Sequence, residues 1–321
     1  MKNIAVCADF ITEPYRRQIS EAAKKAGFSV TYFETQEALG VKIADFEVLY
    51  GYIRPALLPG AKQMRWFCTA SAGVDHYMDA SLWPNPDCIF TNSSGAYGPT
   101  ISEHIVMVSL MLLRRMPEYL PVIGRHEWAQ HFHPIRSVTG SSVVILGTGD
   151  IGSHTARRMK ALGAAVTGVN RSGRTCGPAF DKVVPSSELD SVLPAADLLV
   201  IALPATPETA GILSRERIAL LPASAYVINV GRGSAIDQDA LAEALQERRL
   251  AGAALDVMVP EPLPADHPLW TCPNTILTPH ISGNMSLGLT CQLAVEMFCR
   301  DLAHYAAGEP LEHLVDRARG Y

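Results

Sequence analysis

A glycine-rich segment near the middle of the chain constrains the fold most strongly. An apolar run at residues 143–146 is followed directly by a G-x-G-x-x-G motif, and a helical pattern then continues to residue 162. The glycines permit a tight turn, a close approach of a pyrophosphate to the backbone and close packing of helix on strand, while the helix N-terminus attracts the anion. An isolated motif would often be an ordinary glycine turn, but this context predicts a dinucleotide-binding unit. Its expected cofactor-binding residues are Gly147, Thr148, Gly149, Asp150, Ile151 and Gly152.

Short apolar or β-branched runs alternate with stretches of helical periodicity along the whole chain. This pattern is typical of parallel sheets covered by helices on both faces. We expect two series of strands, at residues 4–8, 30–33, 47–50, 66–69 and 88–91, and then at 143–146, 165–169, 198–202, 226–230, 253–257 and 275–278. A long apolar helix is predicted at residues 99–115, before Pro117. A second is predicted at residues 284–307, with Asn284 as its cap and Gly308 at its end.

The predicted fold class is therefore α/β, with two Rossmann- or flavodoxin-like parallel-sheet domains and an active-site cleft between them. Residues 1–98 together with 284–321 form the expected substrate domain. Residues 99–283 form the expected dinucleotide-binding domain, because six strands suffice for a complete dinucleotide fold.

Composition excludes several other classes of protein. The 321 residues include 27 Lys and Arg against 32 Asp and Glu, a formal charge of −5 without any block of five like charges, so we expect neither a nucleic-acid nor a membrane partner. The longest apolar run, at residues 105–113, is far shorter than the ~20 residues that span a bilayer. Seven scattered cysteines without a C-x-x-C pair fit reduced thiols rather than metal ligands or a catalytic thiol. We therefore predict a cytoplasmic protein without a metal.

The residues after the second strand of the glycine-motif unit predict which dinucleotide binds. An NAD site usually places Asp or Glu there to accept a hydrogen bond from the ribose 2′-hydroxyl, and this chain has Asn170. The neutral and basic donors Asn170, Arg171, Ser172 and Arg174 suit a 2′-phosphate instead. NADP(H) is the predicted cofactor, with NAD used less efficiently. The alternative is that the arginines are solvated loop charges and that NAD binds beside a neutral residue.

Three side chains that follow strands of the second series are candidate catalytic residues. Because carboxyl ends of parallel strands share one edge, Arg232, Glu261 and His280 are expected to gather there. Arg232 can bind the carboxylate and polarise the carbonyl of a 2-oxoacid, and His280 can donate a proton to the carbonyl oxygen. Glu261 can hold the imidazole and stabilise its charged form. Each residue alone would more often be a surface arginine, a structural histidine or a solvated turn glutamate.

The order of these motifs resembles the D-2-hydroxyacid dehydrogenase family over nearly the whole chain. The glycine motif is followed by N-V-G-R-G at residues 229–233, A-L-D-V at 254–257 ending on Glu261-Pro262, and T-P-H at 278–280. The resemblance implies that backbone amides of a substrate-domain loop receive the substrate carboxylate, and that Asp256 faces the nicotinamide carboxamide. It also implies a homodimer, in which the segment around Trp128 contacts the partner and reaches its active site, unless Trp128 is only a packed aromatic. The implied loop residues are Ser71, Ala72, Gly73 and Val74.

Tyr52 and Arg54 follow a strand of the first domain and are the candidates for contact with the substrate side chain. The alternative is that both side chains only pack against neighbours or lie in solvent.

Together these residues predict an oxidoreductase that reversibly reduces a small 2-oxoacid to the D-2-hydroxyacid with NADPH, with the hydride from nicotinamide and the proton from His280. Two other functions stay open: a nucleotide-sensing corepressor or binding protein, and an oxidiser of formate or phosphite on the same scaffold. The retained catalytic side chains and the absence of a long tail favour the enzyme. The sequence does not indicate which oxoacid is the substrate.

Overall fold

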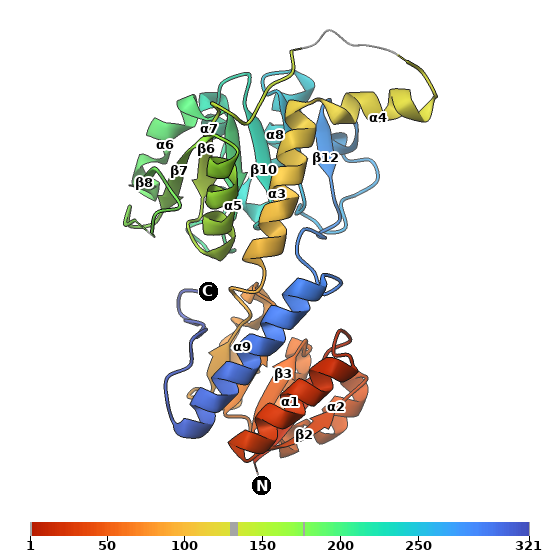
Figure 1. Cartoon of the computed structure of the whole chain (residues 1–321), viewed down its shortest axis with the longest axis vertical. Helices are drawn as coiled ribbons and strands as arrows, with labels where there is room; N and C mark the ends of the chain where they lie inside the picture. The colour runs from red at the N-terminus through yellow and green to blue at the C-terminus, as the bar shows by residue number, and fades with distance from the viewer. Residues whose placement is uncertain (1, 129–133, 176, 321) are drawn as a thin grey trace. The chain divides into compact units, whose positions relative to one another are not determined.

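The computed structural model describes residues 2–128, 134–175 and 177–320. The chain divides into two compact units, one formed by Met1–Tyr97 and Asn284–Tyr321 and the other by Gly98–Gly283 (Figure 1). Gly98 thus belongs to the second unit, one residue before the boundary expected from sequence.

The first unit is built on a five-stranded parallel sheet in the order β2-β1-β3-β4-β5. The register sets Ile4 beside Val30 on one side and beside Val48 on the other. This is a flavodoxin-like order, in which ligands bind at the carboxyl edge of the strands. The strands are β1 Asn3–Cys7, β2 Ser29–Tyr32, β3 Val48–Gly51, β4 Trp66–Thr69 and β5 Ile89–Thr91.

Two helices lie side by side against this sheet and bury its aromatic core (Figure 1). They are α1 Glu13–Ala26 and α9 Gly288–Ala307, and Phe298 of α9 stacks on Tyr50 with ring centroids 4.0 Å apart. The expected start of the last helix was wrong: Asn284 caps a turn instead, accepting from the backbone N–H of Ser286 at 2.9 Å. Gly308 ends α9 with φ 72°, as predicted. The other helices are α2 Gln36–Lys42 and the 3₁₀ turns η1 Ile43–Asp45, η2 Pro55–Gly60, η3 Asp75–Tyr77 and η4 Ala80–Leu82.

The second unit contains a seven-stranded parallel sheet in the order β12-β11-β10-β9-β6-β7-β8. From β6 the strands are added toward one side of the sheet, and from β9 they are added toward the other side. The position between β6 and β9 is therefore the switch point of a Rossmann fold. Sequence reasoning missed the edge strand β8, because a four-residue run that starts with lysine and ends with proline gives little strand signal. The strands are β6 Ser142–Leu146, β7 Ala165–Asn170, β8 Lys182–Pro185, β9 Leu198–Ile201, β10 Tyr226–Asn229, β11 Gly252–Leu255 and β12 Thr275–Leu277.

The long helix predicted at residues 99–115 is α3 in the structure, and a further helix, α4, which the sequence did not indicate, follows it. Helix α3 ends at Leu113, and Arg115 adopts a left-handed φ of 57° before α4 begins at Met116. Pro117 lies in the first turn of α4, where its missing N–H costs nothing. The helices are α3 Gly98–Leu113, α4 Met116–Gly124, α5 Asp150–Ala161, α6 Leu189–Val192, α7 Arg215–Leu220 and α8 Gln238–Gln246, with 3₁₀ turns η5 Ser186–Glu188, η6 Leu193–Ala195, η7 Gly233–Ala235 and η8 Pro268–Thr271.

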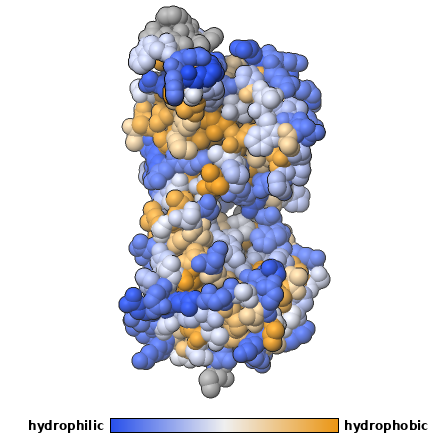
Figure 2. Space-filling view, turned by 90° about the vertical axis from the view of Figure 1, so that its right-hand side faces the viewer, coloured by the Kyte–Doolittle hydropathy of each residue, from blue (hydrophilic) through white to orange (hydrophobic). Residues whose placement is uncertain are grey.

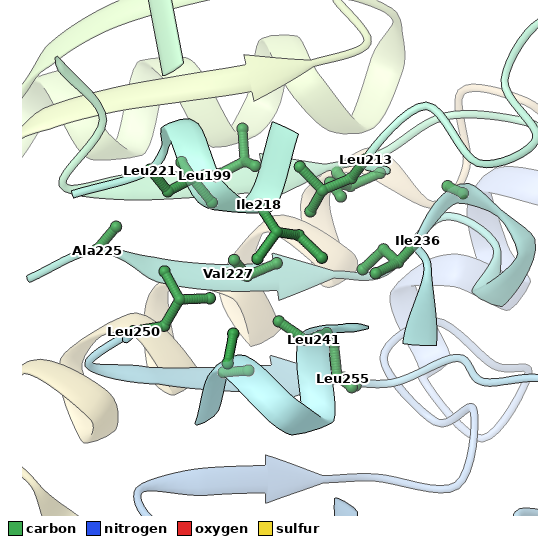
Figure 3. Close-up of a cluster of buried hydrophobic side chains, with 14 of the residues drawn as sticks. Leu199, Leu213, Ile218, Leu221, Ala225, Val227, Ile236, Leu241, Leu250 and Leu255 are labelled. Atoms are coloured by element: carbon green, nitrogen blue, oxygen red, sulfur yellow. The ribbon is translucent and has the colours of Figure 1, made fainter. Parts of the chain in front are cut away.

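Apolar side chains from neighbouring strands and helices form the core of the second unit. Figure 3 shows Val227 of β10 between the side chains of α7 and α8, where Ile218 and Leu241 are almost completely buried. Over the residues that the structure describes, no helix combines the length and apolar character needed to cross a membrane.

Candidate functional site

The backbone around the glycine motif requires two of its three glycines. Gly147 has φ +98°, and a Cβ there would lie 2.5 Å from the carbonyl oxygen of Ala202. A Cβ on Gly152 would lie 1.9 Å from the carbonyl oxygen of Gly147, so only glycine allows α5 to pack this closely. A Cβ on Gly149 would meet no described atom within 4 Å. The turn and the packing therefore need two of the glycines, and the third leaves open space at the N-terminus of α5.

This open space fits the pyrophosphate of a dinucleotide. Gly149 is the N-cap of α5, and among the described residues no side chain caps the helix there. The unsatisfied N–H groups and the positive end of the helix dipole favour an anion at this position. Asp150 faces elsewhere, because its carboxylate accepts from the backbone N–H of Gly98 at 2.7 Å. Its predicted contact with the cofactor stays a prediction, and the structure gives it a role in joining α5 to the start of α3.

Asn170 shapes the loop after β7 instead of presenting its amide to a ligand. Its Nδ2 donates to Thr148 Oγ1 and to the carbonyl oxygen of Arg174, both at 2.9 Å. Its Oδ1 accepts from the backbone N–H groups of Ser172 and Gly173 at 3.1 and 2.7 Å. Arg171 and Arg174 are exposed on this loop. The asparagine thus positions a loop that carries two cations.

The turn after β10 positions Arg232. The Asn229 side chain accepts from the backbone N–H of Gly231 at 3.1 Å and donates to the carbonyl oxygen of Arg232 at 2.9 Å. A Cβ on Gly233 would lie 2.3 Å from the backbone of Met258, so the turn also requires a glycine there. The half-buried Arg232 donates through Nη1 to the carbonyl oxygen of Gly231 at 2.8 Å.

Asp256 has a role that sequence reasoning missed. It is buried after β11, and its carboxylate accepts from Thr278 Oγ1 at 2.5 Å and from the backbone N–H groups of Ile281 and Ser282 at 2.9 Å. Burial acts to raise the pKa of Asp256, but these hydrogen bonds outweigh it and hold the pKa below its ordinary value. The buried carboxylate therefore fixes the loop that carries His280. A contact with the nicotinamide carboxamide stays a prediction.

Glu261 and His280 form a direct pair. His280 Nδ1 lies 2.9 Å from Glu261 Oε2, and Glu261 Oε1 accepts from the backbone N–H of Met258 at 3.1 Å. Because a carboxylate only accepts, Nδ1 carries the hydrogen. No residue that the structure describes hydrogen-bonds Nε2, and the His280 side chain is 48% exposed. This ring can exchange a proton through Nε2 while Glu261 holds its orientation.

These catalytic candidates lie at one edge of the sheet. Arg232 follows β10, Asp256 and Glu261 follow β11, and His280 follows β12, and these three strands are neighbours. The carboxyl ends of parallel strands meet at the same edge, which is the ligand-binding edge of this fold.

In the first unit, the loop after β4 presents three backbone amides. Among the described residues, the N–H groups of Ala72, Gly73 and Val74 have no acceptor. The loop is held from the side, because Asn92 Nδ2 donates to the carbonyl oxygen of Ala72 at 2.7 Å and Ser93 N–H to that of Ser71 at 3.0 Å. Open amides in a fixed loop can bind a carboxylate.

The two candidates for contact with the substrate side chain differ in the structure. Tyr52 is half-buried beside this loop, with its hydroxyl 3.3 Å from that of Tyr97, a neighbour that sequence reasoning missed. Arg54 forms an exposed ion pair with Glu37 at 2.6 Å, which fits its solvated alternative. Trp128 is 96% exposed, so the alternative of a packed aromatic is wrong within this chain.

The described cysteines are free thiols, and most are buried. Burial raises the pKa of Cys68 and of Cys88 to about 12, so neither is a reactive thiolate. Cys176 lies outside the described residues.

A Rossmann sheet with a glycine turn, a paired histidine and a half-buried arginine at its carboxyl edge defines a nicotinamide-dependent oxidoreductase. Comparison with known proteins agrees. The family model described as "D-isomer specific 2-hydroxyacid dehydrogenase, NAD binding domain" matches residues 106–282. The chain belongs to the D-isomer specific 2-hydroxyacid dehydrogenase family, which confirms the resemblance drawn from the motifs.

Relatives with known names cover most of the chain. A glyoxylate reductase of Thermofilum pendens is 30% identical over 81% of this chain and 77% of its own length. A glyoxylate/hydroxypyruvate reductase A of Salmonella newport is 30% identical over 83% of this chain and 85% of its own.

Solved structures share the whole fold. A family protein from Aeromonas salmonicida is 34% identical with a TM-score of 0.86, covering 99% of this chain and 100% of that one. An NADPH-dependent glyoxylate/hydroxypyruvate reductase from Sinorhizobium meliloti, in complex with NADP and sulfate, is 27% identical with a TM-score of 0.83, covering 100% of both chains.

Proposed function

We propose that this protein is an NADPH-dependent reductase that reversibly converts a small 2-oxoacid to the D-2-hydroxyacid. The observation that carries the proposal is the Glu261–His280 pair at 2.9 Å, with Nε2 open at the ligand-binding edge of the sheet. The names of the glyoxylate and hydroxypyruvate reductases above support a small oxoacid substrate. The bound NADP of the Sinorhizobium relative and the cationic loop at Arg171 and Arg174 support NADP as the cofactor.

The cofactor would be held by the glycine turn, the N-terminus of α5 and the two loop arginines. When bound, the reduced nicotinamide supplies the hydride. In the first unit, the amides of Ala72, Gly73 and Val74 bind the substrate carboxylate. In the second unit, Arg232 binds the oxoacid and stabilises the negative charge that develops on the carbonyl oxygen. His280 holds a proton at Nε2 and donates it to that oxygen, while Glu261 fixes the ring and stabilises its charged form. In the reverse direction, Nε2 accepts the hydroxyl proton.

The substrate panel that tests this proposal consists of glyoxylate, hydroxypyruvate and pyruvate. We expect purified protein to oxidise NADPH with at least one of them, followed at the nicotinamide absorbance band, and to yield the D-hydroxyacid from pyruvate. His280→Gln should lose about 10²–10⁴-fold in kcat while binding NADPH normally. NADPH binding without oxidation by any 2-oxoacid would favour a nucleotide-sensing protein. Reduction of NADP by formate or phosphite would favour an oxidiser of formate or phosphite on the same scaffold.

We further propose a cytoplasmic homodimer formed through α3 and α4. Figure 2 shows apolar side chains on the surface of the larger unit, and exposed apolar residues of these two helices include Met107, Leu110, Leu120 and Ile123. Exposed apolar clusters of this kind commonly mark interfaces, and the exposed Trp128 lies shortly after α4. Light scattering on the purified protein should give twice the chain mass. Leu120→Glu should give the single-chain mass, and a monomeric unaltered protein would contradict the proposal.

A further inference from the structure

Asp9 is a charged side chain at the carboxyl edge of the first sheet. Asp9 is exposed two residues after β1, and no ion pair of its carboxylate occurs within the described residues. Arg54, which follows the neighbouring strand β3, is already paired with Glu37. This part of the edge therefore keeps the negative charge of Asp9.

Asp9 and Tyr52 lie shortly after the carboxyl ends of the neighbouring strands β1 and β3. Cys7 at the end of β1 pairs with Gly51 at the end of β3, and the backbone N–H of Tyr52 donates to the carbonyl oxygen of Cys7 at 3.0 Å. The two strand ends approach closely, since a Cβ on Gly51 would lie 2.2 Å from the carbonyl oxygen of Cys7. The Phe10 ring also packs edge-on against the Tyr52 ring, with centroids 6.1 Å apart.

The same register joins Tyr52 to the open amides. Gly51 pairs with Thr69 of β4, so the loop that carries Ala72, Gly73 and Val74 starts one strand further along the edge. Burial raises the pKa of Tyr52, whose hydroxyl is hydrogen-bonded with Tyr97 and Ser71, and the negative charge of Asp9 raises it further. Along this edge, the order is the amide loop, then Tyr52, then Asp9. Two strand spacings amount to roughly 10 Å.

We propose that Asp9 is a specificity-determining residue that discriminates against 2-oxoacids with a second carboxylate. This inference rests on the proposed function, because it takes the amides of the β4 loop as the site of the substrate carboxylate. The rest of the substrate then extends past Tyr52 toward Asp9. A neutral or hydroxyl-bearing substituent is accepted there, and a second carboxylate is repelled by the like charge.

A pair of near-identical substrates isolates the charge. Oxaloacetate and its amide, 2-oxosuccinamate, have almost the same shape and differ by one negative charge at the far end. We expect the unaltered protein to prefer the amide by about 10-fold in kcat/KM, as for like charges several ångströms apart near a protein surface. Asp9→Asn should remove most of this preference and leave kcat/KM for glyoxylate within about 2-fold, because glyoxylate has no substituent. Asp9→Ser should behave in the same way.

Asp45→Asn is the matched control, because Asp45 is an exposed carboxylate that precedes β3 at the opposite edge of the same sheet. It should leave the preference unchanged. Raising the ionic strength should narrow the preference of the unaltered protein but not that of Asp9→Asn, since salt screens exposed charges. If neither compound is turned over, the same comparison is made with D-malate and its monoamide as competitive inhibitors of glyoxylate reduction.

The two proposals fail in different ways. Equal kcat/KM or inhibition constants for the charged and neutral compounds, or a preference that survives Asp9→Asn, would overturn the role of Asp9. Glyoxylate reduction would still stand in that case. Failure to reduce glyoxylate or any other 2-oxoacid would instead refute the proposed function, on which the inference depends.

Discussion

Replacing Glu261 with glutamine tests the geometry of the Glu261–His280 pair most directly. Glu261 uses both carboxylate oxygens as acceptors, Oε1 for the backbone N–H of Met258 and Oε2 for His280 Nδ1. Glutamine has the same shape but only one accepting oxygen, so its NH₂ group must face one of these two N–H groups. Either the ring loses its anchor or the loop at Met258 loses a hydrogen bond.

The size of the effect follows from the exposure of the pair. Hydrogen bonds to charged groups contribute about 1.5–3 kcal/mol, and each 1.4 kcal/mol is a factor of ten. The two side chains are 48% and 38% exposed, which places the effect at the lower end. We therefore expect Glu261→Gln to lower kcat by about 10-fold and to leave the NADPH dissociation constant within about 2-fold.

Steady-state oxidation of NADPH with saturating glyoxylate measures kcat, and fluorescence titration measures NADPH binding. Glu247→Gln is the control, since Glu247 is an exposed carboxylate of the same unit that pairs with Arg249. In a His280→Gln background, Glu261→Gln should have little further effect, because the two residues act as one unit. Normal kcat in Glu261→Gln, or independent effects in the double variant, would refute the reasoning.

Three further predictions follow from the second unit. Gly152→Ala should lower the melting temperature and weaken NADPH binding, because its Cβ would lie 1.9 Å from the Gly147 carbonyl oxygen. Gly149→Ala should weaken NADPH binding by about 10-fold and leave the melting temperature unchanged. Equal melting temperatures for the two variants would contradict the packing argument. The pKa of Asp256 is held below its ordinary 3.8, so its contribution to stability is present above that pH and is lost as pH falls through the folded value. Thr278→Val should therefore lower the free energy of unfolding in urea by about 1–3 kcal/mol at pH 7. When the pH falls below about 4, the variant should lose less of its unfolding free energy than the unaltered protein does. A difference between the two proteins that is the same at both pH values would show that the Asp256 contact is unimportant. Arg171→Ala and Arg174→Ala should each reduce the preference for NADPH over NADH in kcat/KM by up to about 10-fold, with Arg157→Ala on α5 as a control; equal use of both cofactors by the unaltered protein would remove the basis for this prediction.

Much of this protein could be predicted from local sequence. Strand runs such as Trp66–Thr69 and the G-x-G-x-x-G turn depend on neighbouring residues, because periodicity and glycine conformation are local properties. The succession of strands with Arg232, Glu261 and His280 after them was also enough to place these residues at one edge. The parallel order of neighbouring strands determines that edge without any knowledge of side-chain contacts.

The tertiary structure decided which partners the polar side chains take. Asn170 could equally have met a ribose, but in the structure its amide bonds to Thr148 of the glycine turn and to the backbone of its own loop. Asp256 could have faced a ligand, yet three donors from the loop after β12 converge on its carboxylate. Asp9 carries no motif at all and gains meaning only from the register of β1 with β3. A side chain's hydrogen-bond partner depends on residues distant in sequence, whose approach is set by packing and register and not by any local pattern.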